Sequence, residues 1–241
     1  MYKNKKILAI IPARGGSKGL PKKNIRIFLG KPLIVWSIEQ AKRSNYVDAI
    51  LVSTENQEIA NVARKNGIQV PFLRPKALAT DKSPSIDLII HALDWFEKKG
   101  KLFDILVLLQ PTSPLRKRND LDSAIKKLID NGDKANCVIG LGEVLHENPY
   151  LIKKVDNGYV SHVIKMKKNS NTHQRQQLPK SYFPYGVIFA SKVTTLRKEK
   201  TFYQKKTMPY FIERWQNFDI DDIYDFLCAE AIIKEKLDEI I

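Results

Sequence analysis

The strongest chemical signal in the sequence is a loop of small and cationic residues at positions 13–24, directly after the apolar run 6–12. Its glycines allow backbone N–H groups to approach phosphate oxygens, and its cations can neutralise phosphate charge. The spacing fits neither GxxxxGK[ST] nor GxGxxG. We predict that this loop binds a phosphate-bearing ligand, the alternative being a solvated basic turn. The residues concerned are Gly15, Gly16, Gly19, Arg14, Lys18, Lys22 and Lys23.

A second signal is the pair of carboxylates Asp219 and Asp221 near the C-terminal end. On an extended segment, residues i and i+2 project to the same side, so both carboxylates can face one cation. Mg²⁺ prefers oxygen ligands and is commonly held by one or two carboxylates together with substrate phosphates. The pair therefore predicts a Mg²⁺ site. The alternative is that residues 219–222 only cap the last helix.

Alternating strands and helices are expected to position these residues. Unbroken apolar runs suit parallel strands that are buried on both faces. The βαβ rhythm favours a doubly wound, mostly parallel, Rossmann-like α/β sheet, in which ligands bind beyond the carboxyl ends of the strands. The expected strands are 6–12, 49–53, 69–72, 104–109 and one near 136–141, and the expected helices are 32–44, 56–66 with Gly67 as C-cap, 84–99 and 119–131.

The rhythm changes after about residue 143. Asp156, Asn157 and Gly158 form a hairpin signal, and a polar, lysine-rich loop is expected at 165–181. A strand at 186–190, a short helix near 191–198 and a final helix from about 222 complete the pattern. We expect one domain over residues 1–241 with a small β-rich insertion at about 143–185.

Composition excludes disordered and fibrous proteins, and no segment is apolar enough to span a membrane. The 241 residues are 43% hydrophobic and 28% charged, which is typical of a globular chain. No apolar run approaches the roughly 18 residues of a membrane span, and two cysteines agree with a cytoplasmic location. The net charge is +15, and residues 151–210 hold 13 Lys and Arg against two acids. This surplus leaves three alternatives: a nucleic-acid partner, an anionic substrate, or a solvated lysine-rich surface.

Five motifs in order resemble the cytidylyltransferases that activate nine-carbon acidic sugars, the CMP-sialic acid synthetase family. The first is the loop itself, PARGGSKGLPKKN. The others are LRP at 73–75 with LATD at 78–81, LQPTSPLR at 109–116, RQQLP at 175–179, and DID at 219–221 followed by DF at 225–226. The related KDO enzymes carry a tyrosine and an arginine in the first loop, where this chain has Gly15-Gly16 and Lys18-Gly19, so the nonulosonate branch matches better.

The resemblance implies a Mg²⁺-dependent reaction in which CTP and an acidic sugar give the CMP-sugar and pyrophosphate. It implies catalytic roles for Arg14, Lys23 and Asp221, and metal binding by Asp219 and Asp221. It also implies sugar contacts from Gln110, Arg175 and Tyr185, and a homodimer in which the insertion carries Arg175 across to the neighbouring subunit. Arg116 is expected to order the Gln110 loop through an ion pair. The nucleotide-binding residues implied are Ala13, Arg14, Gly15, Gly16, Ser17, Lys18, Lys23, Asn24, Arg74 and Ser85.

Several alternatives remain open at the level of sequence. Ser85 also suits a structural turn, and Arg175 also suits a solvated arginine among lysines. Tyr185 stands where family members often have asparagine, which leaves the identity of the sugar open. A KDO or other sugar nucleotidyltransferase is one rival function. A basic nucleic-acid-binding module is a rival from a different class, although the favoured reading involves neither nucleic acid nor membrane.

Overall fold

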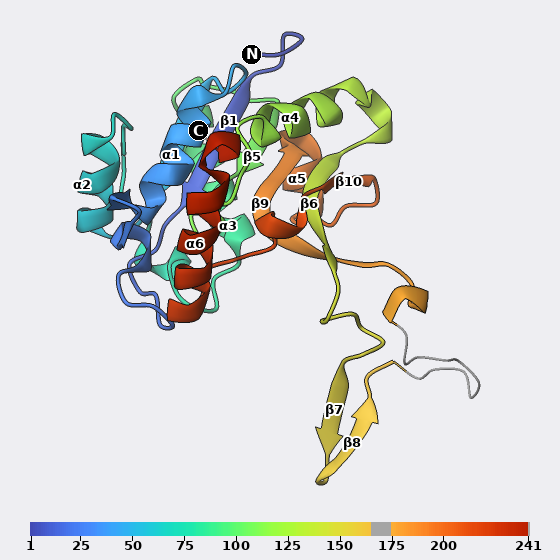
Figure 1. Ribbon diagram of the computed structural model, residues 1–241. Helices are drawn as coiled ribbons and strands as arrows, with labels where there is room; N and C mark the ends of the chain where they lie inside the picture. The colour runs from blue at the N-terminus through green and yellow to red at the C-terminus, as the bar shows by residue number, and fades with distance from the viewer. Residues whose placement is uncertain (165–174, 241) are drawn as a thin grey trace.

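Six strands form the central sheet of the described chain in the order β10-β6-β9-β5-β1-β4 (Figure 1). The computed structural model describes residues 1–164 and 175–240. Strands β4, β1 and β5 run parallel, as do β6 and β10, whereas β9 is antiparallel to both its neighbours. The predicted mostly parallel α/β fold is confirmed. The strands are β1 (Ile7–Pro12), β4 (Ala49–Ser53), β5 (Ile105–Leu108), β6 (Cys137–Val144), β9 (Ser181–Lys192) and β10 (Thr207–Phe211).

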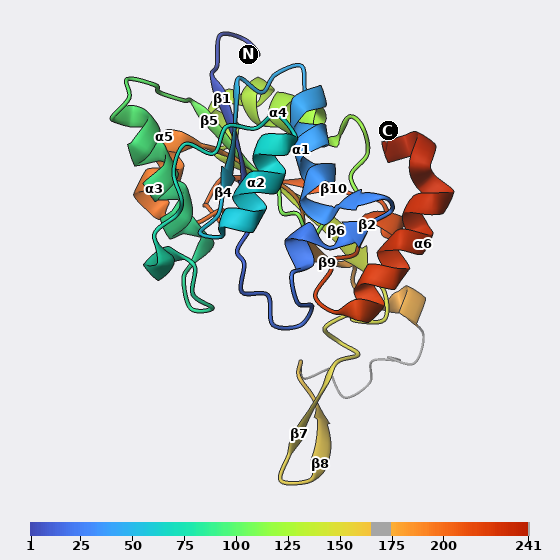
Figure 2. The same ribbon diagram turned by 90° about the vertical axis from the view of Figure 1, so that its left-hand side faces the viewer.

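Helices cover both faces of this sheet, because side chains alternate between the faces along each strand. In β1, Ile7, Ala9 and Ile11 pack with α1 (Leu33–Arg43), α2 (Gln57–Lys65) and α4 (Asp120–Asp130). Leu8 and Ile10 pack on the opposite face with α3 (Ser85–Glu97) and α5 (Val193–Glu199). Figure 2 shows α3 and α1 on either side of the sheet. Strand β1 is therefore buried on both faces, as its unbroken apolar sequence predicts.

The last helix, α6 (Ile223–Ile240), packs on the segment that follows the loop after β1. Phe226 of α6 meets Phe28 edge to face, with ring centroids 5.0 Å apart. Phe28 belongs to a small hairpin of β2 (Ile27–Phe28) and β3 (Lys31–Pro32). Leu20 and Ile220 are buried in the same apolar cluster. This cluster fixes the end of the chain beside the loop that follows β1.

The predicted hairpin is confirmed as β7 (Lys153–Asp156) and β8 (Tyr159–His162). Asn157 and Gly158 have φ of 49° and 80°, the left-handed pair that a two-residue hairpin turn requires. β6 and β9 continue to pair as far as Val144 and Ser181, and the hairpin projects well away from the sheet (Figure 1). The loop expected at 165–181 lies largely outside the described residues.

One expectation about the strands is wrong, and one strand was missed. Residues 69–72 form no strand, although Val70 is buried. Pro71 has no N–H to donate, and the carbonyl of Val70 accepts a bond from Arg64 Nη2 at 3.1 Å instead of joining the sheet. Strand β10 was not predicted at all. It contains Pro209, which is tolerated because β10 lies at the edge of the sheet.

The predicted helices are confirmed. Gly67, with φ of 79°, follows α2 as expected, and the Asn56 side chain caps its N-terminus by accepting bonds from two backbone N–H groups. None of the described helices is long and apolar enough to cross a membrane.

Candidate active site

A cleft of about 540 Å³ lies where β1 and β5 end. It is lined by the loop after β1, by residues of the 74–85 segment, by the turn at 110–112 and by Asp221. Its position agrees with the rule that ligands of open α/β sheets bind beyond the carboxyl ends of strands. Of the residues predicted to bind ligand, those lining the cleft are Arg14, Ser17, Lys18, Gly19, Lys23, Asn24, Arg74, Ser85, Gln110 and Asp221.

The loop after β1 is held at several points. Asn24 Nδ2 donates to the carbonyl of Arg14 at 2.9 Å and so closes the loop on itself. A Cβ atom on Gly19 would collide with the carbonyl oxygen of Asp221, so a glycine is needed where the loop meets the C-terminal segment. Asn24 therefore braces the loop from within.

Two cations of the loop share a carboxylate from across the cleft. Arg14 Nη1 lies 2.6 Å from Asp81 Oδ1, and Lys18 Nζ lies 2.5 Å from Asp81 Oδ2. The hydrogen bonds from Lys18 and then Arg14 hold the pKa of Asp81 below its ordinary value. Asp81 thus supplies the negative charge that a phosphate group would bring to these two side chains.

Lys23 is a buried cation of the same loop, with a side chain only 11% exposed. Its Nζ donates to the carbonyl of Ile220 at 2.5 Å and lies 3.0 Å from Asp221 Oδ1. Burying an ammonium is costly unless it is paired and hydrogen-bonded, and both conditions hold here. Lys23 therefore ties the loop to the acidic segment and presents its charge to the cleft.

The three aspartates at 219, 221 and 222 have different surroundings. Asp222 Oδ1 accepts bonds from the N–H groups of Tyr224 and Asp225 at 2.8 and 3.0 Å, so Asp222 caps α6. Asp219 accepts a hydrogen bond from the Ser113 hydroxyl and another from the Gly186 N–H at 3.3 Å. Asp222 thus caps the helix, and the side chains of Asp219 and Asp221 are available for other roles.

Asp219 and Asp221 bring two carboxylates, two positions apart, to the segment before α6. Burial raises the pKa of Asp219, and the nearby charge of Asp221 adds to that shift. Asp221, 84% exposed, has the Lys23 ammonium as a neighbouring positive charge. Carboxylates supply the oxygen ligands that Mg²⁺ prefers. Among residues 1–164 and 175–240, no cluster of three or more His, Cys, Asp or Glu side chains offers another metal site.

Arg116 holds the backbone of the Gln110 turn in place from within the core. It is fully buried, and burial lowers the pKa of its guanidinium to about 10. Its Nη2 donates to the carbonyls of Gln110 at 2.6 Å and Gly186 at 3.0 Å, and its Nε donates to the carbonyl of Val187. Its Nη1 donates to Ser37 and Gln40. Arg116 orders the Gln110 turn, as expected, but does so through neutral acceptors and not through an ion pair.

The sequence pattern of the cytidylyltransferase family matches residues 8–237, nearly the whole chain and every segment of the cleft. The chain belongs to the cytidylyltransferase family. The resemblance found in the five motifs is therefore confirmed, and the chain is a nucleotidyltransferase.

Curated relatives support the same family. The pseudaminic acid cytidylyltransferase of Campylobacter jejuni is 32% identical over 229 residues, covering 95% of this chain and 97% of the relative. The CMP-N,N'-diacetyllegionaminic acid synthase of Legionella pneumophila is 33% identical over 230 residues, with 95% and 97% coverage. The N-acylneuraminate cytidylyltransferase of Escherichia coli is 32% identical over 231 residues, which is 96% of this chain and 53% of that longer protein.

Solved structures show the same fold. A CMP:2-keto-3-deoxy-manno-octonic acid synthetase in complex with CTP superposes with a TM-score of 0.70 at 17% identity, covering 96% of this chain and 99% of that one. A 4-diphosphocytidyl-2C-methyl-D-erythritol synthase gives a TM-score of 0.63 at 12% identity, with 95% and 100% coverage.

Some predicted site residues of this cytidylyltransferase do not line the cleft. Ala13 is fully buried, and the N–H of Gly15 is bonded to Glu55. Tyr185 is half-buried with its ring 5.0 Å from that of Phe183, and burial raises the pKa of its hydroxyl. Arg175 begins a short 3₁₀ turn beyond the hairpin, and its side chain lies outside the described atoms. The remaining three are Gly16, Lys22, which pairs with Glu58, and Asp219.

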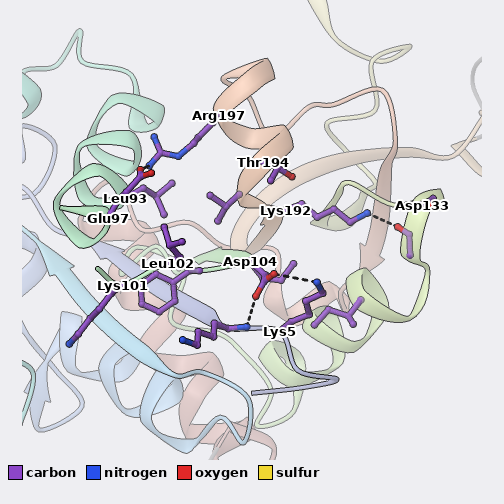
Figure 3. A pocket seen from close by; sticks show the side chains of 16 residues that line it. Lys5, Leu93, Glu97, Lys101, Leu102, Asp104, Asp133, Lys192, Thr194 and Arg197 are labelled. Atoms are coloured by element: carbon purple, nitrogen blue, oxygen red, sulfur yellow. Dashed lines mark hydrogen bonds and ion pairs between the residues drawn. The ribbon is translucent and has the colours of Figure 1, made fainter. Parts of the chain in front are cut away.

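A larger hollow of about 730 Å³ lies at the opposite edge of the sheet of this cytidylyltransferase (Figure 3). It has an apolar floor that includes Leu93 and Leu102. Three cations on its rim already have partners: Lys5 pairs with Asp104, Lys192 donates to a backbone carbonyl, and Arg197 pairs with two acids of α3. The hollow lies at the amino ends of β1 and β5, away from the loop after β1.

Two residues at the cleft were not predicted from the sequence. Ser113 donates to Asp219, and Glu55 contacts both the loop after β1 and Arg74. Glu55 directly follows β4, the neighbour of β1, so its place at the carboxyl edge of the sheet was an available signal. Ser113 lies inside the LQPTSPLR motif, where only Gln110 and Arg116 had been singled out.

Proposed function

We propose that this cytidylyltransferase transfers CMP from CTP to a nonulosonic acid, a nine-carbon 2-keto acid sugar, and releases pyrophosphate. The observation that carries the proposal is the meeting of the cationic loop and the acidic segment in one cleft, through Lys23 and Asp221. The names of three relatives, which act on pseudaminic, legionaminic and N-acylneuraminic acids, support this class of sugar.

In the proposed reaction, the anomeric hydroxyl oxygen of the sugar attacks the α-phosphorus of CTP. The new O–P bond forms as the bond to the β-phosphate oxygen breaks, and pyrophosphate leaves with that electron pair while the hydroxyl proton passes to solvent. This chemistry depends mainly on positioning and charge neutralisation. Arg14, Lys18 and Lys23 would neutralise the triphosphate, and Asp81 would release the first two when CTP enters.

Other parts of the cleft would bind the rest of the nucleotide. Arg74 and Ser85 are proposed to contact the cytidine, because both line the cleft together with the cationic loop. Ser17 and the backbone of residues 13–16 would add hydrogen bonds to the phosphates, and Asn24 would hold that backbone in place through the carbonyl of Arg14.

We propose that Asp219 and Asp221 hold Mg²⁺. When bound, the ion would supply a Lewis acid that polarises the phosphate and favours loss of the hydroxyl proton. Ser113 and the Gly186 N–H orient the Asp219 carboxylate for this role. Lys23 would exchange its contact with Asp221 for contact with phosphate oxygens.

The sugar and the partner subunit complete the proposal. Gln110 lines the cleft, and Tyr185 and Arg175 are proposed to contact the sugar.

Val155, Tyr159 and Val160 of the projecting hairpin are 68–80% exposed, which supports a homodimer that covers them and brings Arg175 to the neighbouring cleft. Light scattering tests this proposal: a mass of twice 27.7 kDa is expected, and a monomer would contradict it. Because the reaction consumes CTP, we expect the enzyme in the cytoplasm.

The activity is tested by identifying the product. The protein is incubated with CTP, Mg²⁺ and N-acetylneuraminic acid, and with other nonulosonic acids, and the products are identified by mass spectrometry. A CMP-sugar that forms with a nonulosonic acid and disappears on chelation supports the proposal. Salt-dependent retention on DNA without any CTP turnover would support a nucleic-acid-binding function in its place.

A further inference from the structure

Glu55 joins the loop after β1 to Arg74 of the cleft with one carboxylate. Its Oε1 accepts a hydrogen bond from the Gly15 N–H at 2.6 Å, and its Oε2 lies 2.8 Å from Arg74 Nη2. The side chain of Glu55 is 16% exposed and that of Arg74 is 3% exposed. Hydrogen bonds between charged groups that are shielded from water are among the stronger ones.

The turn that carries Glu55 is packed tightly against the phosphate loop. A Cβ atom on Gly15 would lie 2.7 Å from Asn56 Nδ2, closer than real contacts allow. Asn56 in turn caps α2, and its N–H donates to the Thr54 hydroxyl at 3.1 Å. The carboxylate is therefore presented by a rigid turn, and it can set the position of the loop at Gly15.

Arg74 depends on Glu55 for its orientation. Its backbone N–H donates to the carbonyl of Thr54 at 2.8 Å, and Nη2 is held by Glu55. Its Nε is buried and has no hydrogen-bond partner among the described residues, although Arg74 lines the cleft. A buried donor without a partner is costly, and an acceptor on a ligand would relieve that cost.

We propose that Glu55 is a positioning residue that couples triphosphate binding to base discrimination, by fixing the phosphate loop and Arg74 with one carboxylate. This inference rests on the proposed function, in which Arg74 contacts the cytidine. An arginine presents only donors, which suit the N3 and O2 acceptors of cytosine, whereas uracil presents a donor at N3. A fixed Arg74 therefore favours CTP over UTP, and a loosened one discriminates less.

The test measures binding of CTP and of UTP to the full chain by calorimetry, for the unaltered protein and for Glu55→Gln. The amide keeps the shape of the side chain, but it can no longer accept from both partners as a carboxylate does. We expect CTP affinity to fall about tenfold and the ratio of CTP to UTP affinity to fall by about threefold or more. Glu55→Asp, which keeps the charge but has a shorter reach, should lie between the two.

Glu58→Gln is the matched control. Glu58 pairs with Lys22 of the same loop at 3.1 Å, but its side chain is 56% exposed and its partner does not line the cleft. This variant should leave both affinities within about twofold. Equal losses of CTP and UTP affinity in Glu55→Gln, or no loss, would overturn the inference alone. Failure of the unaltered protein to bind CTP would overturn both the inference and the proposed function.

Discussion

Lys23 and Asp221 meet although 198 residues separate them in the sequence, with Nζ 3.0 Å from Oδ1. The pair joins the first loop of the sheet to the segment before α6, and the ammonium is also held by the carbonyl of Ile220. One end of the chain thus supplies a cation suited to phosphate, and the other end supplies a carboxylate suited to a metal ion. The pair has to separate or rearrange when both ligands are bound.

Asp221→Asn should abolish turnover and leave the fold intact. The amide removes a negative oxygen ligand from the proposed metal site, while the exposed position of Asp221 limits any effect on stability. We expect pyrophosphate release to fall by about a hundredfold or more. The protein should still fold, with a somewhat lower melting temperature, because the buried Lys23 ammonium keeps its bond to the carbonyl of Ile220 but loses its paired carboxylate. Asp222→Ala is the control: loss of the α6 cap should cost about 1 kcal/mol of stability and leave turnover intact. Retained activity in Asp221→Asn would remove the metal assignment.

Asp81→Asn should bind CTP more tightly. Asp81 pairs with both Arg14 and Lys18, and a triphosphate has to displace it. Removing this competing charge should lower the Kd for CTP by about two- to fivefold, as measured by calorimetry. Weaker binding in the variant would show that Asp81 orders its own loop and does not compete with the nucleotide.

Asp219→Asn should raise stability while it abolishes activity. Because burial raises the pKa of Asp219 above its ordinary value near 3.8, the folded state favours the protonated carboxyl. The free energy of unfolding therefore falls as pH rises through the window above 3.8, and the cost is fully present at neutral pH. Urea titrations at pH 7 should give a higher midpoint for the variant. A lower midpoint would mean that the ionised carboxylate stabilises the fold.

Arg116→Lys should destabilise the protein strongly. Lysine cannot reproduce the planar fork that satisfies the carbonyls of Gln110, Gly186 and Val187, and it leaves a charge buried with fewer bonds. We expect a loss of about 3–5 kcal/mol in urea unfolding. Arg118→Lys, at a neighbouring exposed position, should cost almost nothing. Equal stability of the two variants would contradict the supporting role of Arg116.

Much of the fold could be predicted from the sequence, because the patterns that indicate its strands and turns are local. Unbroken apolar runs identify β1, β4 and β5, and the Asn157-Gly158 turn identifies the hairpin. Strand β10 escapes prediction because Pro209 is acceptable only at a sheet edge, and edge position is a property of the whole topology. Residues 69–72 mislead for the related reason that apolar burial does not require strand pairing.

In the candidate site, too, local patterns could be predicted but contacts that depend on tertiary packing could not. The cationic loop and the aspartate pair can be recognised from residue types and spacing, and the cleft brings most of them together. The contacts of Asp81 and Glu55 could not be predicted, because each depends on the packing of a loop against another strand end. Arg116 shows the same limit, since its charge suggested an ion pair whereas its partners are mainly backbone carbonyls.

The most direct test of the proposed activity is pyrophosphate release from CTP and Mg²⁺ with a panel of nonulosonic acids and KDO. We predict release with at least one nonulosonic acid, lost on chelation of the metal and in Asp221→Asn. Release with KDO alone would contradict the proposed sugar class while keeping the chemistry. Failure of the protein to bind CTP at all would contradict the account as a whole.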